Sequence, residues 1–267
     1  MKKAKNILLA IVIIGLYLLI YSTLGTAFRK LPFTKNNLYL MQIIVYIIMT
    51  VLLLLTLKAL NKMHILKFDK NKFIKGFLVG GFVVFFIIFV FIDEFNLGLQ
   101  KYEHFQPLSQ IILCSVSIII GTGFTEEVLC RGIVQNLMYD TFGKNSKKGI
   151  YLSIILTSIL FGLAHFANYF NTNARFEGVL TQVIVATLIG LYLGAIYARC
   201  NSIWAVALLH GLFDFVQMVG EAFWGSSTLV QTIDGYHLNQ IVAPFILYTF
   251  LFLFLLRKKK IKECFEN

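Results

Sequence analysis

The sequence predicts an all-α membrane protein, a polytopic transmembrane helical bundle with about eight spanning helices. Of its 267 residues, 58% are apolar, and the mean hydropathy is +0.78. Soluble domains are usually about 45 to 50% apolar, so this composition excludes an ordinary soluble protein. Little sequence remains between the apolar stretches, so we expect residues 1–267 to form a single transmembrane domain.

Eight apolar stretches are long enough, or nearly long enough, to cross a hydrocarbon core, which takes about 20 helical residues. The expected spans are residues 7–24, 38–57, 73–92, 108–124, 150–166, 179–198, 203–219 and 241–256. The first three contain almost no polar side chains and are expected to be scaffold. The first is longer than the apolar core of a secretory signal peptide, about 7 to 15 residues, and no cleavage site is evident. We interpret it as a spanning anchor.

The net charge of +11 indicates a membrane topology rather than a nucleic-acid partner. Eight crossings place both termini on one side, and 19 of the 24 basic residues fall on that side. Because basic residues gather in cytoplasmic loops, both termini are predicted to be cytoplasmic in a multi-pass protein of the cell membrane. The loop at residues 25–37 fits this topology least well, since Arg29, Lys30 and Lys35 lie on its predicted outer side.

The polar side chains with the highest free-energy cost of insertion into a membrane lie at residues 121–131, where a long uncharged stretch is followed by two glutamates and an arginine. A charge in the middle of a spanning helix costs roughly 2.5 to 3.5 kcal/mol on insertion scales, so such residues are usually kept for a function. Gly121 and Gly123 are expected to loosen the helix or to permit a close backbone approach. Thr125 is expected to cap a new helical segment that runs through Met138.

On that segment Glu127 and Arg131 are four residues apart, with the acid nearer the N-terminus, which is the favourable order for an ion pair. Glu126 points about 100° away and is free to face another group. Alone, these residues fit two interpretations equally well. They are either a functional pair of acids or a structural salt bridge beside a glutamate at the membrane interface.

Two later spans each carry a histidine with a partner four residues away. Phe161 and His165 share one face of the fifth span, and His210 and Asp214 share one face of the seventh. A lone histidine in such a helix is more often a packing residue. Here there are two histidines, and Asp214 and Glu126 also need polar partners within the lipid. One shared polar site explains all four residues better.

These groups follow one another along the chain as Glu126-Glu127-x-x-x-Arg131, then Phe161-x-x-x-His165, then His210-x-x-x-Asp214. The series resembles the motifs of the CPBP family, which comprises the CAAX prenyl proteases and the Abi or bacteriocin-processing proteins. The resemblance covers residues 108–219. Each motif alone is a weak signal, but three in this order within membrane helices are a strong one. The resemblance implies an intramembrane endopeptidase that uses a glutamate-activated water or, in an older interpretation, a bound metal.

Amide hydrolysis needs a base for water and a donor for the oxyanion. A carboxylate in an apolar site is a stronger base than one in water, so we assign Glu126 as the general base. His165 would hold the water or pass its proton on, and His210 would donate to the oxyanion, a contact typically worth about 10² to 10³ in rate. Glu127 and Arg131 would hold the helix and position the substrate backbone.

Asp214 departs from the family pattern, in which many members have asparagine. An ionised aspartate cannot donate to an oxyanion, so Asp214 is expected either to stay protonated or to orient His210.

Two other chemistries stay open. Glu126, His165 and His210 together resemble the ligands of a catalytic zinc site, although the sequence has no HExxH and each ligand would come from a different helix. Cys130 lies one turn after Glu126 and could act as a nucleophile, but a buried cysteine is more often a small apolar side chain. The four cysteines form no CxxC pair, which argues against a disulfide framework.

The sequence supports two classes of function. The first is an endopeptidase that hydrolyses a peptide bond in a membrane-associated substrate, either a peptide or bacteriocin precursor or a CAAX-like protein. The second is a non-proteolytic immunity or regulatory protein of the same fold. A proton-coupled transporter would be favoured by an internal repeat, and none is visible. The small residues Ala186, Gly190, Gly194 and Ala198 form one helix face, which fits either a dimer seam or packing inside the bundle.

Overall fold

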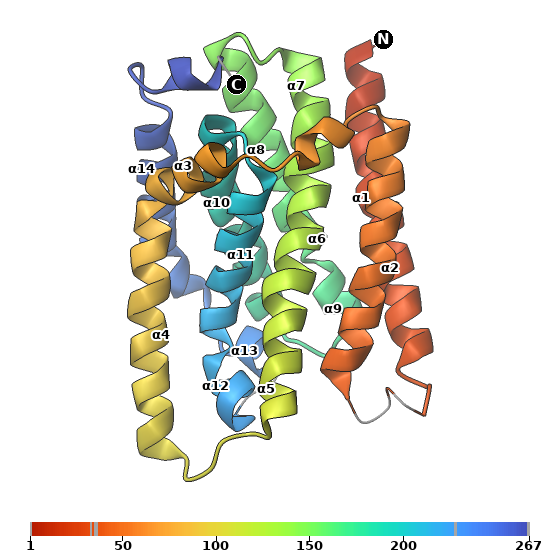
Figure 1. Ribbon diagram of the computed structural model, residues 1–267, viewed down its shortest axis with the longest axis vertical. Helices are drawn as coiled ribbons and strands as arrows, with labels where there is room; N and C mark the ends of the chain where they lie inside the picture. Colours follow the sequence, from red (N-terminus) through yellow and green to blue (C-terminus); the bar gives the residue numbers. More distant parts are fainter. Residues whose placement is uncertain (1, 33, 35–36, 227–228, 266–267) are drawn as a thin grey trace.

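The computed structural model describes residues 2–32, 34, 37–226 and 229–265, and over these residues it is helical and contains no strand. Figure 1 shows the long helices aligned with the long axis of the molecule and both termini at the same end. We call this the terminus end and the opposite one the distal end. The all-α bundle expected from the sequence is confirmed. Lys35 lies outside the described residues.

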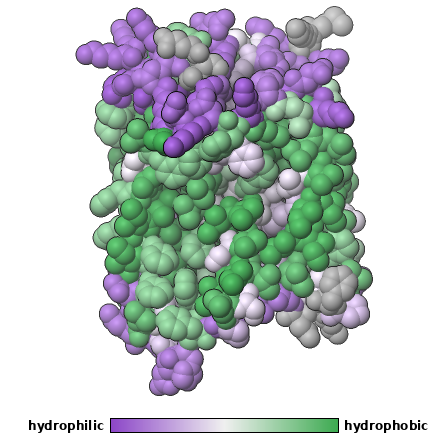
Figure 2. Space-filling model, viewed as in Figure 1, coloured by the Kyte–Doolittle hydropathy of each residue, from purple (hydrophilic) through white to green (hydrophobic). Residues whose placement is uncertain are grey.

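Within the described residues, seven helices are long and apolar enough to cross a membrane. They are Lys3–Phe28, Leu38–Ala59, Gly81–Lys101, Leu108–Phe142, Lys147–Asn171, Phe176–Cys200 and Leu238–Leu255. An eighth apolar helix, Ile203–Gln217, is shorter. Figure 2 shows an apolar band between two hydrophilic ends, the larger of which is the terminus end. The chain is therefore a multi-pass membrane protein.

The elements have the following bounds: α1 Lys2–Phe28, α2 Leu38–Ala59, η1 Met63–Leu66, α3 Lys70–Val79, α4 Gly81–Lys101, α5 Leu108–Ser115, η2 Val116–Thr122, α6 Gly123–Glu127, η3 Val128–Gln135, α7 Asn136–Phe142, α8 Lys147–Ala164, α9 Ala167–Asn171, α10 Phe176–Cys200, α11 Ile203–Gln217, α12 Val219–Trp224, α13 Leu229–Asp234, η4 Leu238–Ile241, α14 Val242–Leu255 and η5 Ile261–Cys264. The unbroken series from α5 to α7 is the fourth span.

Several helix ends follow from single residues. Side-chain oxygens of Asn37, Ser146 and Ser202 accept backbone N–H groups in the first turns of α2, α8 and α11. At the other ends, Asn201 closes α10 with φ 50° and Gly143 closes α7 with φ 86°. These left-handed and extended positive-φ conformations favour asparagine and glycine. The connections between the long spans are short, so consecutive spans lie antiparallel (Figure 1).

The expected third span, residues 73–92, is wrong in its bounds. The chain turns at Gly80, which ends the short helix α3 and precedes α4. A Cβ on Gly80 would lie 3.0 Å from Leu209, so the turn packs tightly against α11. The spanning helix α4 then continues to Lys101 and includes Asp93 and Glu94, which lie beyond the expected end of the span at residue 92.

The seventh span is also shorter than expected. We predicted residues 203–219, but α11 ends at Gln217 after 15 residues and is followed by the separate helix α12. Because α11 lies among other helices and is largely buried, its length need not match the thickness of the hydrocarbon core.

Arg131 was counted among the basic residues of the cytoplasmic side, and this assignment is wrong. Its side chain is fully buried inside the bundle. Most basic residues of the described segments keep their expected separation, because the loops between α2 and α3 and between α7 and α8 and the C-terminal segment lie at the terminus end (Figure 1).

The small-residue face of α10 lies inside the bundle. Ala186 and Ala198 are 8% and 2% exposed, and a Cβ on Gly190 or Gly194 would meet side chains of α8. Backbone oxygens on this face accept hydrogen bonds from the fourth span. Packing within the bundle therefore accounts for this face, and it is not available as a dimer seam.

Candidate active site

Glu126 and Glu127 lie in α6, between the two π-helical segments η2 and η3 of the fourth span. Such wider turns inside an α-helix occur frequently at functional sites. The expected new helix with an N-terminal cap at Thr125 is wrong, because the helix runs through this residue without interruption. The Thr125 hydroxyl instead lies 3.3 Å from that of Thr50 on α2.

Two glycines bring the fourth span against α11. A Cβ on Gly123 would lie 2.6 Å from the Ala207 oxygen and 2.7 Å from the Gly211 Cα. A Cβ on Gly211 would in turn collide with the backbone oxygen of Ile119. The backbones therefore lie very close together, which confirms the close approach expected at Gly123. One turn after Gly123, Glu127 faces His210, the residue next to Gly211 on α11.

Glu127, Arg131 and His210 form a buried polar group. Their exposed fractions are 0%, 0% and 4%. Glu127 Oε1 accepts hydrogen bonds from Arg131 at 2.5 Å and from His210 Nδ1 at 2.8 Å. Arg131 also donates to the Gly190 oxygen at 3.1 Å. The expected ion pair between Glu127 and Arg131 is present, and the same carboxylate also holds His210.

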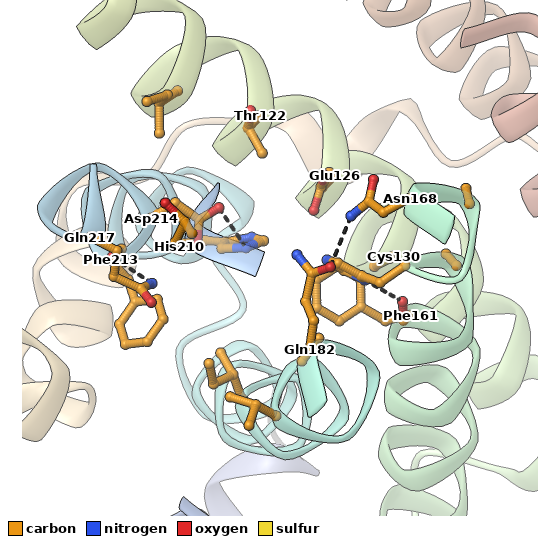
Figure 3. Close-up of a pocket in the computed structure, with 18 of the residues that line it drawn as sticks. Thr122, Glu126, Cys130, Phe161, Asn168, Gln182, His210, Phe213, Asp214 and Gln217 are labelled. Carbon is orange, nitrogen blue, oxygen red and sulfur yellow. Dashed lines mark hydrogen bonds and ion pairs between the residues drawn. The ribbon is translucent and has the colours of Figure 1, made fainter. Parts of the chain in front are cut away.

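A cavity of about 470 Å³ lies beside this group. Its lining includes all four residues that the sequence singles out for chemistry, which are Glu126, His165, His210 and Asp214. Figure 3 shows Glu126 of the fourth span and His210 and Asp214 of α11 around the same space. Glu126 is half-buried, and the described residues show no hydrogen bond to its carboxylate. It thus faces the cavity while Glu127 faces the interior, as their spacing predicts.

Phe161 connects the two histidines of the site. The ring of His165 meets the Phe161 ring edge-on, with centroids 4.9 Å apart, and the ring of His210 does so at 5.7 Å. The guanidinium of Arg131 lies 5.2 Å from the centroid of the same ring. His165 Nδ1 is 3.0 Å from the Phe161 backbone oxygen and must donate there, so its Nε2 carries no proton when the ring is neutral. Phe161 thereby orients the ring of His165 and packs against that of His210.

Asp214 lies next to His210, with Oδ2 3.4 Å from Nε2. This distance is longer than an ordinary hydrogen bond, and the carboxylate is 31% exposed. Of the two roles left open for Asp214, the contact favours orienting His210. Because Nδ1 donates to Glu127, His210 has a second N–H, at Nε2, only as an imidazolium.

The suggested zinc ligands do not form a ligand set. Among the residues that the structure describes, no group of three histidine, cysteine, aspartate or glutamate side chains is arranged to hold a metal ion. Glu126, His165 and His210 line one cavity, but both ring nitrogens of His210 already face carboxylates. Cys130 also lines the cavity and is 3% exposed.

One wall of the cavity was not predicted from the sequence. We expected the first spans to be scaffold, but Tyr17, Tyr21 and Tyr46 of α1 and α2 line it. The Tyr21 hydroxyl donates to that of Tyr46 at 3.2 Å, and Tyr46 is 2.9 Å from the hydroxyl of Thr122. Three tyrosines that recur on one face of two neighbouring spans were the available signal.

A second pair of polar residues was also missed. Asn168 of α9 donates to Gln182 of α10 at 2.9 Å, and both line the cavity (Figure 3). Amides of this kind suit the backbone of an extended peptide. Asn168 follows the end of the apolar stretch, where a polar residue is unremarkable, so the sequence offered no signal for it.

One of the comparisons with known proteins identifies a related family. Residues 108–216 match the family model described as Rce1-like, Type II CAAX prenyl endopeptidase. The matched segment runs from the start of α5 to near the end of α11 and includes all the motif residues. No curated protein and no solved structure matches the chain significantly. The family match, on the same segment that carries the three motifs, supports the assignment of this chain to the CPBP family of CAAX-type intramembrane proteases.

Proposed function

We propose that the protein is an intramembrane endopeptidase that hydrolyses a peptide bond in a membrane-associated peptide or protein through a water activated by Glu126. One observation carries the proposal. Glu126, His165, His210 and Asp214, from three separate helical segments, line one cavity within the bundle. A protein that only binds a peptide has no evident need for a carboxylate and two imidazoles in one apolar space.

In the proposed reaction Glu126 removes a proton from water, and the oxygen attacks the carbonyl carbon of the scissile bond. The C–N bond then breaks, and the proton held by Glu126 passes to the leaving nitrogen. His165 accepts a hydrogen bond from the water through Nε2, since its Nδ1 proton is directed at Phe161. One water is consumed, and the products are a carboxylate and an amine.

His210 stabilises the oxyanion in this proposal. As an imidazolium it donates through Nδ1 to Glu127 and has its Nε2 proton available for the substrate oxygen. The long contact from Nε2 to Asp214 is readily exchanged for a shorter one to an oxyanion. Glu127 and Arg131 act behind this donor as positioning residues, because both are fully buried and neither lines the cavity.

The second candidate is a non-proteolytic immunity or regulatory protein that binds a peptide in the same cavity. The amide pair Asn168 and Gln182 favours a peptide ligand in either case. The two candidates differ in whether the peptide is cut.

Comparative peptidomics of membranes separates them. A strain that lacks the protein would be restored with the wild type, with His165→Ala or with the control Asp93→Asn, which alters an exposed carboxylate on α4 outside the cavity. We expect a shortened peptide to appear with the wild type and with Asp93→Asn and to be missing with His165→Ala. The same product with His165→Ala at equal protein levels would contradict the proposed function.

A further inference from the structure

We infer that the cavity receives its substrate from the extracytoplasmic face of the membrane. That the bound molecule is a substrate depends on the proposed function. The direction of access depends only on the position of the cavity in the bundle and on the distribution of charge. The corresponding substrate class is a peptide segment exposed outside the cytoplasm, belonging either to an exported peptide or to an outward-facing part of a membrane-anchored protein.

The cavity occupies the distal half of the bundle. Helices that run away from the terminus end, such as α8 and α11, contribute residues near their C-terminal ends, including His165 and Asp214. Helices that run toward the terminus end, such as α2 and α10, contribute residues near their N-terminal ends, including Tyr39 and Gln182. The connection between α13 and α14, on the side of α14 that points away from the terminus end, adds Gln240.

The exposed part of the lining is confined to the same half. Four of the lining residues are exposed, and they are Leu38, Asn171, Gln217 and Gln240. Leu38 begins α2, Asn171 ends α9 and Gln217 ends α11. Each of these helix ends lies toward the distal end in Figure 1. The cavity therefore opens there.

Toward the terminus end the cavity is closed by close packing. All residues of η3 are buried, from Val128 to Gln135. Ile154 of α8, Ile196 of α10 and Val206 of α11 are each 0% exposed. A peptide approaching from that end would have to separate helices that are packed as tightly as a protein core.

The charge distribution identifies the terminus end as cytoplasmic. Lysines and arginines cluster at the terminus end, whereas the distal end carries only a few, among them Arg29, Lys101 and Arg175. Such an excess of basic residues in short loops marks the cytoplasmic side. A cavity that opens at the opposite end must then face away from the cytoplasm.

The experiment measures modification of single cysteines by a membrane-impermeant thiol reagent, first in intact cells and then after permeabilisation. Asn171→Cys and Gln240→Cys report on the cavity mouth, and Gln182→Cys reports on its interior. Lys67→Cys and Lys259→Cys, at exposed positions of the terminus end, are the matched controls. The unsubstituted protein gives the background, because its four cysteines are buried.

We expect Asn171→Cys, Gln240→Cys and Gln182→Cys to be modified in intact cells, with no further gain after permeabilisation. The two lysine positions should react only after permeabilisation. The reverse pattern would overturn the inference. So would a result in which Asn171→Cys reacts in intact cells but Gln182→Cys reacts only after permeabilisation, or not at all. The readout does not require catalysis, so an inactive protein with the expected labelling would contradict the proposed function alone.

Discussion

Glu127 Oε1 accepts a hydrogen bond from His210 Nδ1 at 2.8 Å, and this contact joins two spans that are more than 80 residues apart in sequence. The same oxygen accepts from Arg131, so one buried carboxylate holds both a cation and the imidazole of the candidate site. The proton on Nδ1 is thereby fixed, and Nε2 is directed toward the cavity. The predictions below test this arrangement and the chemistry proposed for it.

Removing the Glu127 carboxylate should destabilise the fold. In Glu127→Leu the buried Arg131 loses its charge partner, and loss of one member of a buried pair costs about 3 to 5 kcal/mol. We expect a clear fall in the temperature of unfolding of the purified protein in detergent. The double variant Glu127→Leu with Arg131→Met should recover most of the stability, because neither member of the buried ion pair is left without its partner.

The same pair of variants separates stability from activity. The double variant should remain inactive although it is stable, since His210 has lost the acceptor that fixes its Nδ1 proton. Full peptidase activity in a stable double variant would show that the contact between Glu127 and His210 is not needed.

The close approach of the fourth span and α11 should depend on Gly123. In Gly123→Ala the new methyl group would lie 2.6 Å from the Ala207 oxygen, so the helices must move apart. Gly132→Ala on the same span is the matched control, because its nearest neighbour would be an ordinary 3.7 Å away. We expect cleavage to fall in Gly123→Ala and to persist in Gly132→Ala. Equal rates in the two variants would contradict the role of this approach.

Asp214 should tolerate asparagine better than an apolar residue. Asp214→Asn keeps an oxygen that can face His210 Nε2 and adds N–H groups that can donate to the oxyanion. We expect its kcat to equal or exceed that of the wild type. Asp214→Leu leaves His210 without a partner at Nε2, and its kcat should fall, by up to about 10² if the oxyanion contact is lost. A kcat for Asp214→Asn as low as that for Asp214→Leu would contradict this account of Asp214.

Cleavage should not depend on a metal. In the described residues no group of three histidine, cysteine, aspartate or glutamate side chains is arranged to hold a metal ion, and both ring nitrogens of His210 face carboxylates. The purified protein, dialysed against a strong chelator and analysed for zinc, is expected to retain its rate. Loss of activity that added zinc restores would refute the water-activated mechanism.

The sequence predicted the fold class and most of the candidate site because both depend on local patterns. The apolar stretches show the spans, and the i, i+4 spacings place Glu127 with Arg131, Phe161 with His165, and His210 with Asp214. The contact between Glu127 and His210 could not be predicted, since it depends on how Gly123 and Gly211 let two distant helices meet.

The errors have similar physical causes. A hydropathy pattern averages over Gly80, so it joined α3 to part of α4 and ended the span before Asp93 and Glu94. Thr125 resembles a helix cap in sequence, but the helix continues through it, with a π-helical segment on each side. The tyrosines of α1 and α2 have apolar rings that do not interrupt an apolar stretch, so the sequence pattern did not indicate that they line the cavity.

The most direct test is the rate at which Glu126→Gln cuts a peptide that the wild-type protein is shown to cut. Glutamine keeps the shape of the side chain but cannot accept a proton from water, and a general base contributes about 10² to 10⁴ to the rate. We expect kcat to fall by a factor in this range while the variant stays folded and still binds the peptide. An unchanged kcat would contradict the claim that Glu126 activates the water.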